Sequence, residues 1–495
     1  MSVPFSPLIT QPKTPDFMKK LQSILWMAAA GFLATACETP TQYEYVRLSD
    51  AACTFLADGN IPKAIEVAAS GPWSAETGAS WLTVTEEAEG IVLAAADNKA
   101  DSERRTEITI ACGQATARIT VIQMAPEHRT NRYRILKTFD MGAVLSKNGR
   151  YAAGNVKTVR TDDVWENRPT VIDLETDEWI QFGPLPDDLY CIEVPFAVSD
   201  EGTVFFYDSN TNGCIGFDIS GNAFTPKAPA GQTTIPQVQS ISADGRIWVG
   251  WGHQPGNLYQ PIRWIDGEPE ILPVPPLNFR DAPYVTGVTA RGCSADGSVI
   301  YGSTWDNLDF GMLYWKEGKV DWVGSDVRET QTVQIDNGAG ETIDYRLVNG
   351  MIATAEYTKI SPNGRWIAGA YRTEKLAGND IARTQYPAFF NTETGKTTIV
   401  TDFGEGYASH ATDDGLGIIL LGTFLPSSGI VYDIEHQVSL GSVEEWVSDN
   451  YGIIIPTGYI TYITPDRSRL MGNVLESTAV GTRVVSWYVA PPLEK

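Results

Sequence analysis

The sequence has few of the residues from which metal sites and disulfide frameworks are built. Its 495 residues include only six cysteines and four histidines, and no two cysteines form a CxxC pair. Because zinc sites in proteins draw on clustered Cys and His, we expect no metal site and no bound cofactor. A nucleophile elbow, an HExxH motif and a phosphate-binding loop are missing as well, so no standard catalytic motif is present.

Basic residues are also in short supply. The chain has 37 Lys and Arg against 61 Asp and Glu, a formal net charge of −24. An acidic surface repels nucleic acid and anionic membrane faces, so we expect neither as a partner. The acidity itself is explained most simply by the solubility of a secreted protein, and it identifies no ligand.

Long apolar runs are scarce too. The one candidate, from Leu21 to Ala36, follows Met18-Lys19-Lys20 and is shorter than the roughly 20 residues that span a bilayer. A basic start, a short apolar region and small residues before a cleavage point are typical of a secretory signal. The alternative is a short transmembrane anchor.

The end of this run, Leu33-Ala34-Thr35-Ala36-Cys37, resembles a bacterial lipobox, although its Leu stands four residues before the cysteine instead of three. The resemblance implies that residues 1–36 are a leader and signal peptide, that Cys37 is lipidated, and that residues 37–43 form a tether. It also implies a cell-envelope location, for which we expect the outer membrane and surface exposure.

The other five cysteines would lie in an oxidising compartment, which favours disulfides. Cys53 and Cys112 belong to one small domain, while Cys191 and Cys214 are close in sequence. Either pair is a candidate bridge. Because five is an odd number, at least one thiol must stay unbridged, and Cys293 is the cysteine outside both pairs.

Residues 44–125 contain short alternating apolar runs with turn residues every 8–12 positions or so, which is typical of a small β-sandwich. In order along this unit stand Pro72-Trp73-Ser74, Gly78-Ala79-Ser80-Trp81, Ala96-Asp97-Asn98, Glu103-Arg104-Arg105-Thr106 and Val121-Ile122-Gln123. This order resembles the BACON domain family of Bacteroidetes over nearly the whole unit. The resemblance implies either carbohydrate association or a spacer that holds a partner domain away from the membrane.

Two tryptophans of this unit decide between those roles. Trp73 and Trp81 have the flat faces that stack on sugars, but a domain this small needs every large apolar side chain for its core. We therefore favour core packing for both, and a spacer role for the unit. Residues 126–131 follow as a polar linker.

The remainder, residues 132–495, is organised by a recurring turn of the form Ser/Thr-x-Asp/Asn-Gly. The seven copies and variants occupy residues 146–149, 199–202, 242–245, 294–297, 361–364, 412–415 and 464–467, with Glu201 in place of the Asp/Asn and Arg467 in place of the Gly. Asp-Gly and Asn-Gly pairs supply the positive φ values of tight hairpins, and alternating apolar residues after the turns indicate strands. Five copies also carry a glycine six residues after the Asp/Asn position: Gly154, Gly250, Gly302, Gly369 and Gly472.

Each repeat has room for four short strands, and a period of about 40–50 residues with that content is typical of a β-propeller blade. We therefore predict an all-β protein, with an N-terminal β-sandwich followed by a seven-bladed β-propeller. The last copy lacks a fourth strand, whereas the run 133–139 precedes the first copy. We predict that this run completes the last blade and closes the ring, since an open ring would leave two exposed sheet edges.

Loops between the second and third strands should surround the mouth of the propeller, on the rim opposite the repeated turns. Aromatic side chains beside carboxylates and amides on a concave rim suit sugar recognition. Six ligand-binding candidates follow from this placement: Trp251, His253, Trp305, Asp306, Tyr371 and Arg372. The alternative for Trp251 and Trp305 is packing between blades.

Three functions remain open from the sequence. The leading one is a lipid-anchored protein whose propeller binds a glycan or a protein without catalysis. The second is a polysaccharide hydrolase or lyase, which needs two placed carboxylates, with Asp162, Asp306 and Glu374 as candidates. The third is a structural scaffold. His410, just before a repeated turn, is a channel-facing candidate that we interpret as structural, and the long insertion at residues 328–351 predicts a hairpin or flap.

Overall fold

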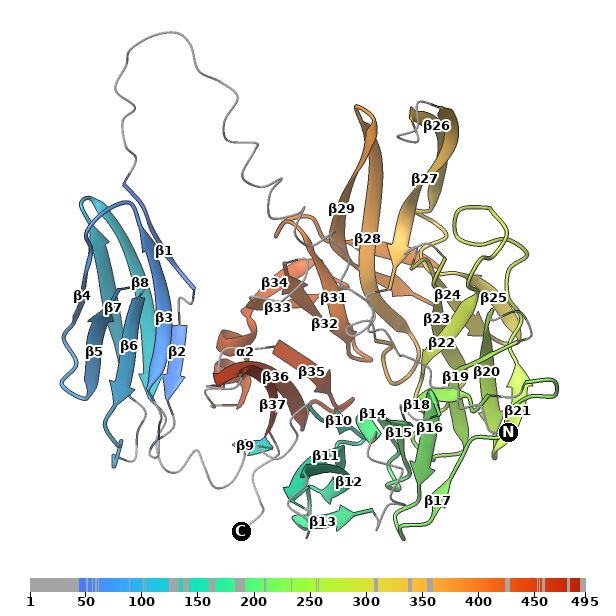
Figure 1. Cartoon of the computed structure of the whole chain (residues 1–495), viewed down its shortest axis with the longest axis horizontal. Coiled ribbons are helices and arrows are strands. Elements are labelled where there is room, and N and C mark those ends of the chain that lie inside the picture. The colour runs from blue at the N-terminus through green and yellow to red at the C-terminus, as the bar shows by residue number, and fades with distance from the viewer. Residues whose placement is uncertain are drawn as a thin grey trace, which may run out of the picture.

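The structure is a computed structural model that describes residues 44–123 and 133–489, apart from short gaps, the longest of which are 137–141, 160–164, 183–191, 354–358 and 423–427. The signal peptide, Cys37, the tether and the linker therefore lie outside the described residues. Of the described residues, most belong to small antiparallel sheets (Figure 1). The all-β prediction is confirmed at that level.

The N-terminal unit consists of two four-stranded sheets, β1-β3-β6-β5 and β2-β8-β7-β4. Its strands are β1 (Val46–Leu48), β2 (Ala52–Phe55), β3 (Lys63–Ala69), β4 (Ser74–Thr77), β5 (Leu82–Glu87), β6 (Gly90–Ala95), β7 (Arg104–Cys112) and β8 (Ala115–Gln123). The pair β2 and β8 is parallel, whereas the others are antiparallel. Alternate residues of β7 and β8, among them Ile108, Ile110 and Val121, are fully buried in the core, as expected for a sandwich with one solvated face on each sheet.

Seven further sheets follow in chain order, and we number them I to VII. Sheet I is β10 (Val144–Leu145), β11 (Tyr151–Val159), β12 (Trp165–Asp173) and β13 (Glu178–Gln181). Sheet II is β14 (Ile192–Val198), β15 (Val204–Asp208), β16 (Gly213–Phe217) and β17 (Ala223–Phe224). Sheet III is β18 (Gln237–Ile241), β19 (Ile247–His253), β20 (Tyr259–Ile265) and β21 (Glu268–Ile271). Sheet IV is β22 (Val288–Cys293), β23 (Val299–Thr304), β24 (Met312–Lys316) and β25 (Lys319–Trp322).

Sheet V has five strands, β26 (Glu329–Asp336), β27 (Thr342–Ile352), β28 (Trp366–Ala377), β29 (Asp380–Asn391) and β30 (Lys396–Ile399). Sheet VI is β31 (Gly406–Ala411), β32 (Leu416–Leu421), β33 (Ser428–Asp433) and β34 (Val438–Ser442). Sheet VII is β35 (Tyr459–Ile463), β36 (Leu470–Thr478), β37 (Gly481–Val489) and β9 (Tyr133–Leu136). The pairing of Val489 with Tyr133 and of Ser486 with Leu136 confirms that the strand before the first repeat completes the last sheet.

Five of the repeated turns share one hydrogen-bond scheme, whereas in the turn at 199–202 the Ser199 hydroxyl accepts from the amides of Glu201 and Thr203. In the turn at 242–245, the Ser242 hydroxyl donates to the Asp244 carboxylate at 2.6 Å and accepts from the Ile247 amide at 2.9 Å, while Asp244 also accepts from the Arg246 amide at 3.1 Å. Gly245 has a φ of 73°, which a side chain disfavours. The first, third and fourth positions of the motif are thus each explained by the turn that they build.

The recurring glycine in the second strand has a different cause. At Gly250 a Cβ would overlap the carbonyl oxygen of Gln237, and at Gly302 it would overlap that of Thr289. Both carbonyls belong to the innermost strand of their sheet, which bulges immediately afterwards, between Val238 and Ser240 in sheet III. The bulge brings the two backbones together, so only glycine fits.

Neighbouring turns are connected by hydrogen bonds. The Asp200 amide donates to the Ala243 carbonyl at 2.9 Å, and the Ala243 amide donates to the Ala295 carbonyl at 2.7 Å. The chain's first and last turns are joined as well, because the Tyr462 hydroxyl donates to the Lys147 carbonyl at 2.9 Å. A buried cluster that includes Met471 and Tyr488 of sheet VII and Ile172 of sheet I lies beside this junction.

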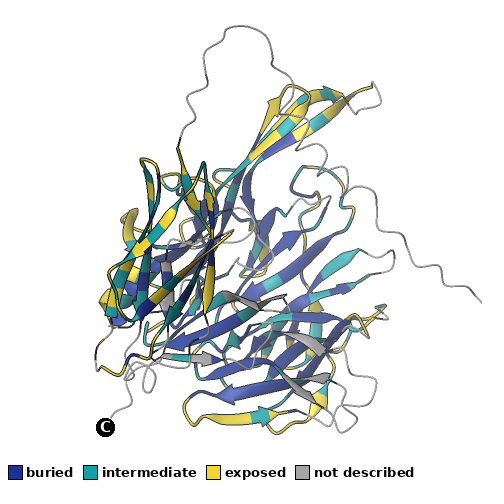
Figure 2. Cartoon of the chain, turned by 60° about the vertical axis from the view of Figure 1, so that its left-hand side comes forward, coloured by how far each residue is buried: buried dark blue, intermediate teal, exposed yellow. Residues whose placement is uncertain are grey.

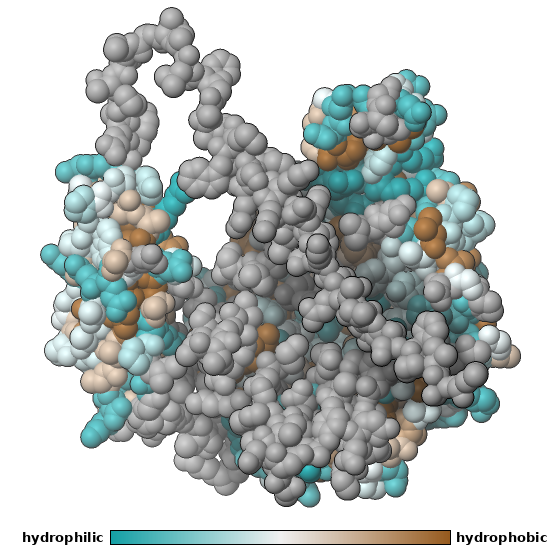
Figure 3. All heavy atoms as spheres, in the orientation of Figure 1, coloured by the Kyte–Doolittle hydropathy of each residue, from teal (hydrophilic) through white to brown (hydrophobic). Residues whose placement is uncertain are grey.

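Two long hairpins of sheet V project from the other sheets (Figure 1), and their outer ends are largely exposed (Figure 2). The prediction of a hairpin at residues 328–351 is confirmed by the pairing of β26 with β27. The same projection is mostly hydrophilic in Figure 3. The sequence analysis missed α2 (Val443–Tyr451), although Ser442 and Glu445 form a reciprocal capping box at its start, which is a recognisable sequence signal.

The disulfide expectations are wrong. Cys112 and Cys214 carry free, buried thiols, so neither the Cys53–Cys112 bridge nor the Cys191–Cys214 bridge is formed. In the N-terminal unit the reason is geometric, because strand β8 lies between β2, which holds Cys53, and β7, which holds Cys112. The Cys214 sulfur instead donates to the Pro236 carbonyl at 3.3 Å.

Candidate functional site

A cavity of about 120 Å³, which we call the inner cavity, is lined by the innermost strand in six of sheets I to VII and, beside sheet V, by Lys359 and Ile360 from the segment before β28. Its walls come largely from residues two or three positions before each repeated turn: Phe196, Gln239, Ser240, Arg291, Lys359, His410, Thr461 and Tyr462. In five sheets a β-bulge falls at these positions. A bulge redirects side chains, and here it aims polar groups at one shared space.

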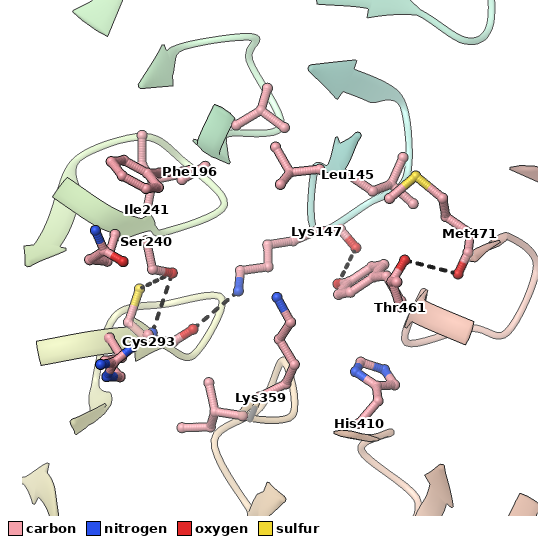
Figure 4. A pocket seen from close by; sticks show the side chains of 18 of the residues that line it. Leu145, Lys147, Phe196, Ser240, Ile241, Cys293, Lys359, His410, Thr461 and Met471 are labelled. Atoms are coloured by element: carbon pink, nitrogen blue, oxygen red, sulfur yellow. Dashed lines mark hydrogen bonds between the residues drawn. The ribbon is translucent and has the colours of Figure 1, made fainter. Parts of the chain in front are cut away.

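Two lysines reach into the inner cavity and point toward one another (Figure 4). Lys147, from the turn of sheet I, donates to the Cys293 carbonyl at 3.1 Å. Lys359, from the segment before β28, has no hydrogen-bond acceptor for its ammonium among the residues that the structure describes. Burial, reinforced by the charge of Lys147, lowers the pKa of Lys359 to about 8, yet this lysine keeps accessible surface because it faces the cavity.

Arg291 adds a third positive charge to the cavity wall. Its Nε donates to the Ser303 hydroxyl at 2.7 Å, and its guanidinium lies 4.9 Å from the centroid of the Trp305 ring. Burial lowers the pKa of Arg291, but a guanidinium stays charged in proteins. The Ser303 hydroxyl and the Trp305 ring are thus two of the groups that its charge contacts.

His410 faces the inner cavity, as the sequence analysis expected of a channel-facing residue. The Ile463 amide donates to its Nε2 at 3.3 Å. Burial, together with the nearby charges of Lys359 and Lys147, lowers the pKa of His410 to about 3. The imidazole is thus neutral at pH 7, and its contact with β35 supports the structural role that we expected.

No carboxylate is among the described residues that line the inner cavity. Acidic groups occur in the connected turns, where the Asp200 carboxylate accepts from the Asn148 amide at 2.8 Å and the Asp413 carboxylate accepts from the Asn363 amide at 2.8 Å. Burial raises the pKa of both carboxyls. In a protein of net charge −24, the cavity is a local concentration of positive charge.

Three of the six sequence-derived candidates meet in an aromatic cluster. Trp251 and His253 lie at the end of β19, not in a loop, and their rings are 5.4 Å apart. Tyr259, at the start of β20, lies 4.7 Å from Trp251 and 6.4 Å from Trp305, which follows β23. The cluster spans sheets III and IV, so both tryptophans contribute to packing between sheets while all four rings stay half-buried. Sequence reasoning missed Tyr259.

Asp306 is engaged by the backbone around it. Its Oδ1 accepts from the amides of Val285 at 3.0 Å, Thr286 at 2.6 Å and Gly287 at 3.1 Å, and from the Thr286 hydroxyl at 2.9 Å. Oδ2 accepts from the Asn278 side chain at 2.9 Å. Burial alone would raise the pKa of this carboxyl, but these hydrogen bonds outweigh it and hold the pKa below its ordinary value. Both carboxylate oxygens of Asp306 therefore accept hydrogen bonds from other groups of the protein.

Tyr371 and Arg372 lie inside strand β28 instead of in a rim loop. The strand extends this far because Glu374 fixes it: the Arg280 guanidinium donates to both carboxylate oxygens of Glu374 at 2.8 and 2.9 Å, and Arg383 donates at 3.0 Å. Arg372 is buried, and its Nε is 3.8 Å from the same carboxylate. Burial opposes ionisation of Glu374, yet its hydrogen bonds to Arg280 and Val348 lower its pKa to about 2.

The hydrolase hypothesis requires two carboxylates, but both candidates accept hydrogen bonds from within the protein: Asp306 from backbone amides and Glu374 from arginines. Asp162, the third candidate, lies outside the described residues, as does Cys37. Ligand binding at the six candidates stays a prediction. The cavity lysines and Arg291 were missed by sequence reasoning, although aligning the residues just before each repeated turn would have brought them together.

Several of the residues on which the BACON resemblance rests belong to one connected network in the N-terminal unit. Arg104 donates to the Gln123 side chain at 2.8 Å and to the Ala96 carbonyl at 2.6 Å, and its guanidinium lies 4.7 Å from the Trp81 ring. Trp73 and Trp81 are half-buried against the core of the unit. These contacts support the expected packing role of both tryptophans.

Residues 71–124 match the BACON family model, described as a putative binding domain, N-terminal. This part of the chain is therefore similar to that family, in agreement with the resemblance seen in the sequence. No curated protein matches the chain. Within the described residues, no helix combines the length and the apolar character needed to cross a membrane.

Solved structures give only distant likenesses. TolB from Acinetobacter baumannii is 15% identical over 61% of this chain and 61% of that chain, with a TM-score of 0.28. A putative TolB from Agrobacterium tumefaciens is 12% identical over 56% of this chain and 89% of its own, with a TM-score of 0.32. A DUF4784 family protein from Bacteroides caccae is 9% identical over 80% of this chain and 95% of its own, with a TM-score of 0.23. At these scores the likenesses carry no argument.

Proposed function

We propose that this protein is a lipid-anchored binding protein of the bacterial cell envelope, exposed at the outer membrane through Cys37. In this proposal sheets I to VII are the blades of a closed seven-bladed β-propeller, and the N-terminal unit is a spacer. Three observations support the ring: β9 completes sheet VII, neighbouring turns are hydrogen-bonded, and the innermost strands of six sheets share one cavity with the segment before β28 of sheet V.

The ligand that we propose is a glycan, bound non-catalytically at the aromatic cluster of Trp251, His253, Tyr259 and Trp305. The observation that carries this proposal is the grouping of four half-buried rings at the ends of β19, β20 and β23. Aromatic faces stack on sugar rings, and His and Tyr supply hydrogen-bonding groups for hydroxyls. Binding is favoured over hydrolysis because Asp306 and Glu374 are both engaged within the protein.

A glycan array tests this proposal, using the chain from Cys37 onwards without lipid beside a fragment from Asn131 onwards. We expect both to bind the same glycans, and Trp251→Ala to weaken binding at least tenfold. Trp179→Ala is the matched control, because Trp179 is 42% exposed on the outer strand β13.

Binding lost with the N-terminal unit would overturn the spacer role. If neither form bound any glycan on the array, the proposal of a glycan ligand would be wrong. A protein ligand would then be favoured, as in a structural scaffold.

A further inference from the structure

We propose that the inner cavity binds a small oxyanion, a phosphate, sulfate or carboxylate group, between the ammonium groups of Lys147 and Lys359, with Arg291 adding positive charge from the wall. This site is distinct from the aromatic cluster and does not depend on the proposed glycan. The ligand class follows from the positive charge of the cavity, the unused ammonium donors of its lysines and the volume of the cavity.

The charge of the cavity is uncompensated by its own walls. Lys147, Lys359 and Arg291 all line it, whereas its described lining residues include no carboxylate. Burial first, and then the repulsion between the two lysines, lowers the pKa of Lys359. Burying like charges without a partner is unfavourable, and proteins normally pair such groups. An anion between the ammonium groups would relieve both the repulsion and the loss of hydration.

The donors of Lys359 face the cavity unused. Its side chain points inward (Figure 4) and has no acceptor among the described residues, whereas Lys147 uses one donor on the Cys293 carbonyl. An ammonium has three N–H donors, so most of the donor capacity of the pair is directed at the cavity. Oxyanions accept several hydrogen bonds at once and make short, strong ones with cations.

The size of the cavity sets the upper limit for the group. Its volume of about 120 Å³ is well above the roughly 10–15 Å³ required by one water molecule, so a single polyatomic anion fits without displacing the walls. Hydroxyl groups in the wall are already bonded, as Tyr462 is to the Lys147 carbonyl and Thr461 is to the Met471 carbonyl at 3.2 Å. Recognition therefore depends on the cations.

Isothermal titration calorimetry of the lipid-free chain with sodium sulfate, sodium phosphate and sodium acetate, at constant ionic strength against chloride, tests the site. We expect saturable binding of at least one of these anions, weakened tenfold or more by Lys359→Met and by Lys147→Met. Lys375→Met is the matched control, because Lys375 is exposed on β28, and it should bind like the wild type. Equal binding by the wild type and both cavity variants, or no binding of any anion, would overturn the proposal.

A proton-uptake measurement keeps the proposal testable if a variant fails to fold. Near pH 8 the ammonium of Lys359 is about half deprotonated, and an anion beside it should draw back up to about half a proton. The other titratable groups at the cavity are Lys147, Arg291, His410, Cys293, Tyr301 and Tyr462. The carboxylates of the turns that act on them are those of Asp200, Asp244, Asp296, Asp413 and Asp466. Titration in buffers of different ionisation enthalpy measures the uptake, and binding without uptake would overturn the role of Lys359.

One further titrant distinguishes a free oxyanion from an acidic group carried by a larger molecule. Glucuronate carries a carboxylate on a sugar, and glucose is its uncharged control. Binding of inorganic sulfate or phosphate would support a free anion as the ligand. Binding of glucuronate alone would support an acidic group carried by a larger molecule.

Discussion

Replacing Asp306 with asparagine should destabilise the protein without any ligand present. The substituted side chain keeps one oxygen for the four donors that now meet Oδ1, but its amide group would face the Asn278 amide nitrogen, now 2.9 Å from Oδ2. Asn278 cannot turn to accept, because its own Oδ1 accepts from the amides of Arg280 and Ala282, each at 3.0 Å. Two donors would therefore oppose each other in a buried site.

The size of the effect follows from these contacts. Hydrogen bonds to a charged group contribute about 1.5–3 kcal/mol and neutral ones about 0.5–1.5 kcal/mol. Losing the bond to Asn278, together with the charge that strengthens the others, should lower the free energy of unfolding by about 2–4 kcal/mol. Guanidinium denaturation of the lipid-free chain measures this difference, and Asp344→Asn, at an exposed position of β27, should stay within about 0.5 kcal/mol of the wild type.

The pH dependence has a definite sign. The pKa of Asp306 is lowered in the folded protein, so its contribution is complete above the unfolded value near 3.8 and is lost as pH falls through the folded value. A stable Asp306→Asn variant would refute this reasoning. If that variant also lost turnover of a polysaccharide, Asp306 would be catalytic and the hydrolase hypothesis would be restored.

Two further perturbations test the buried charges. Glu374→Gln should destabilise the projecting hairpins by about 3–5 kcal/mol, because it leaves Arg280 and Arg383 without their carboxylate. Amide hydrogen exchange of strands β26 to β29 measures this destabilisation, with Glu329→Gln as the exposed control. Unchanged exchange in Glu374→Gln would contradict the prediction. His410→Gln should reduce the loss of stability in acid. The pKa of His410 is about 3 in the folded protein, whereas a histidine in the unfolded chain has a pKa of about 6.5. Below about pH 6.5 the unfolded chain therefore binds more protons than the folded protein, and the free energy of unfolding decreases as the pH is lowered. From pH 7 to 4.5 the wild type should lose about 2–3 kcal/mol more than the variant in urea denaturation, and parallel losses would contradict the assignment.

The fold could be predicted from the sequence at positions where the backbone geometry admits only one type of residue. The Asp-Gly turns and the glycines such as Gly250 were visible because a positive φ or a close backbone contact admits almost nothing else. Hence the seven repeated sheets, six of them four-stranded, the completing strand β9 and the hairpin β26–β27 were predicted correctly. The N-terminal sandwich was recognisable because Trp81, Arg104 and Gln123 are tied into one network.

The site was harder to predict because its residues have many uses. Asp306 and Glu374 looked like rim carboxylates, and only their partners, from Thr286 to Arg280, reveal structural roles. Arg372 was placed in a loop because nothing in the local sequence indicates how far a hairpin extends once an ion pair stabilises it. The cavity lysines were overlooked for the converse reason: a lysine normally lies on the surface, and their convergence depends on which ends of the seven sheets meet.

One residue of the inner cavity, Arg291, contacts the aromatic cluster, and this contact determines how the two proposed sites can be told apart. Arg291 lines the inner cavity and also lies against Trp305, so its substitution would disturb anion and glycan binding together and would be uninformative. Trp251 contacts His253 and Tyr259 but does not line the cavity, whereas Lys359 lines the cavity and has no contact with the aromatic cluster among those described. If the sites are independent, Trp251→Ala should affect only glycans and Lys359→Met only anions. If one ligand spans both, each substitution should weaken binding of the same acidic glycan, and the double variant should lose less than the sum.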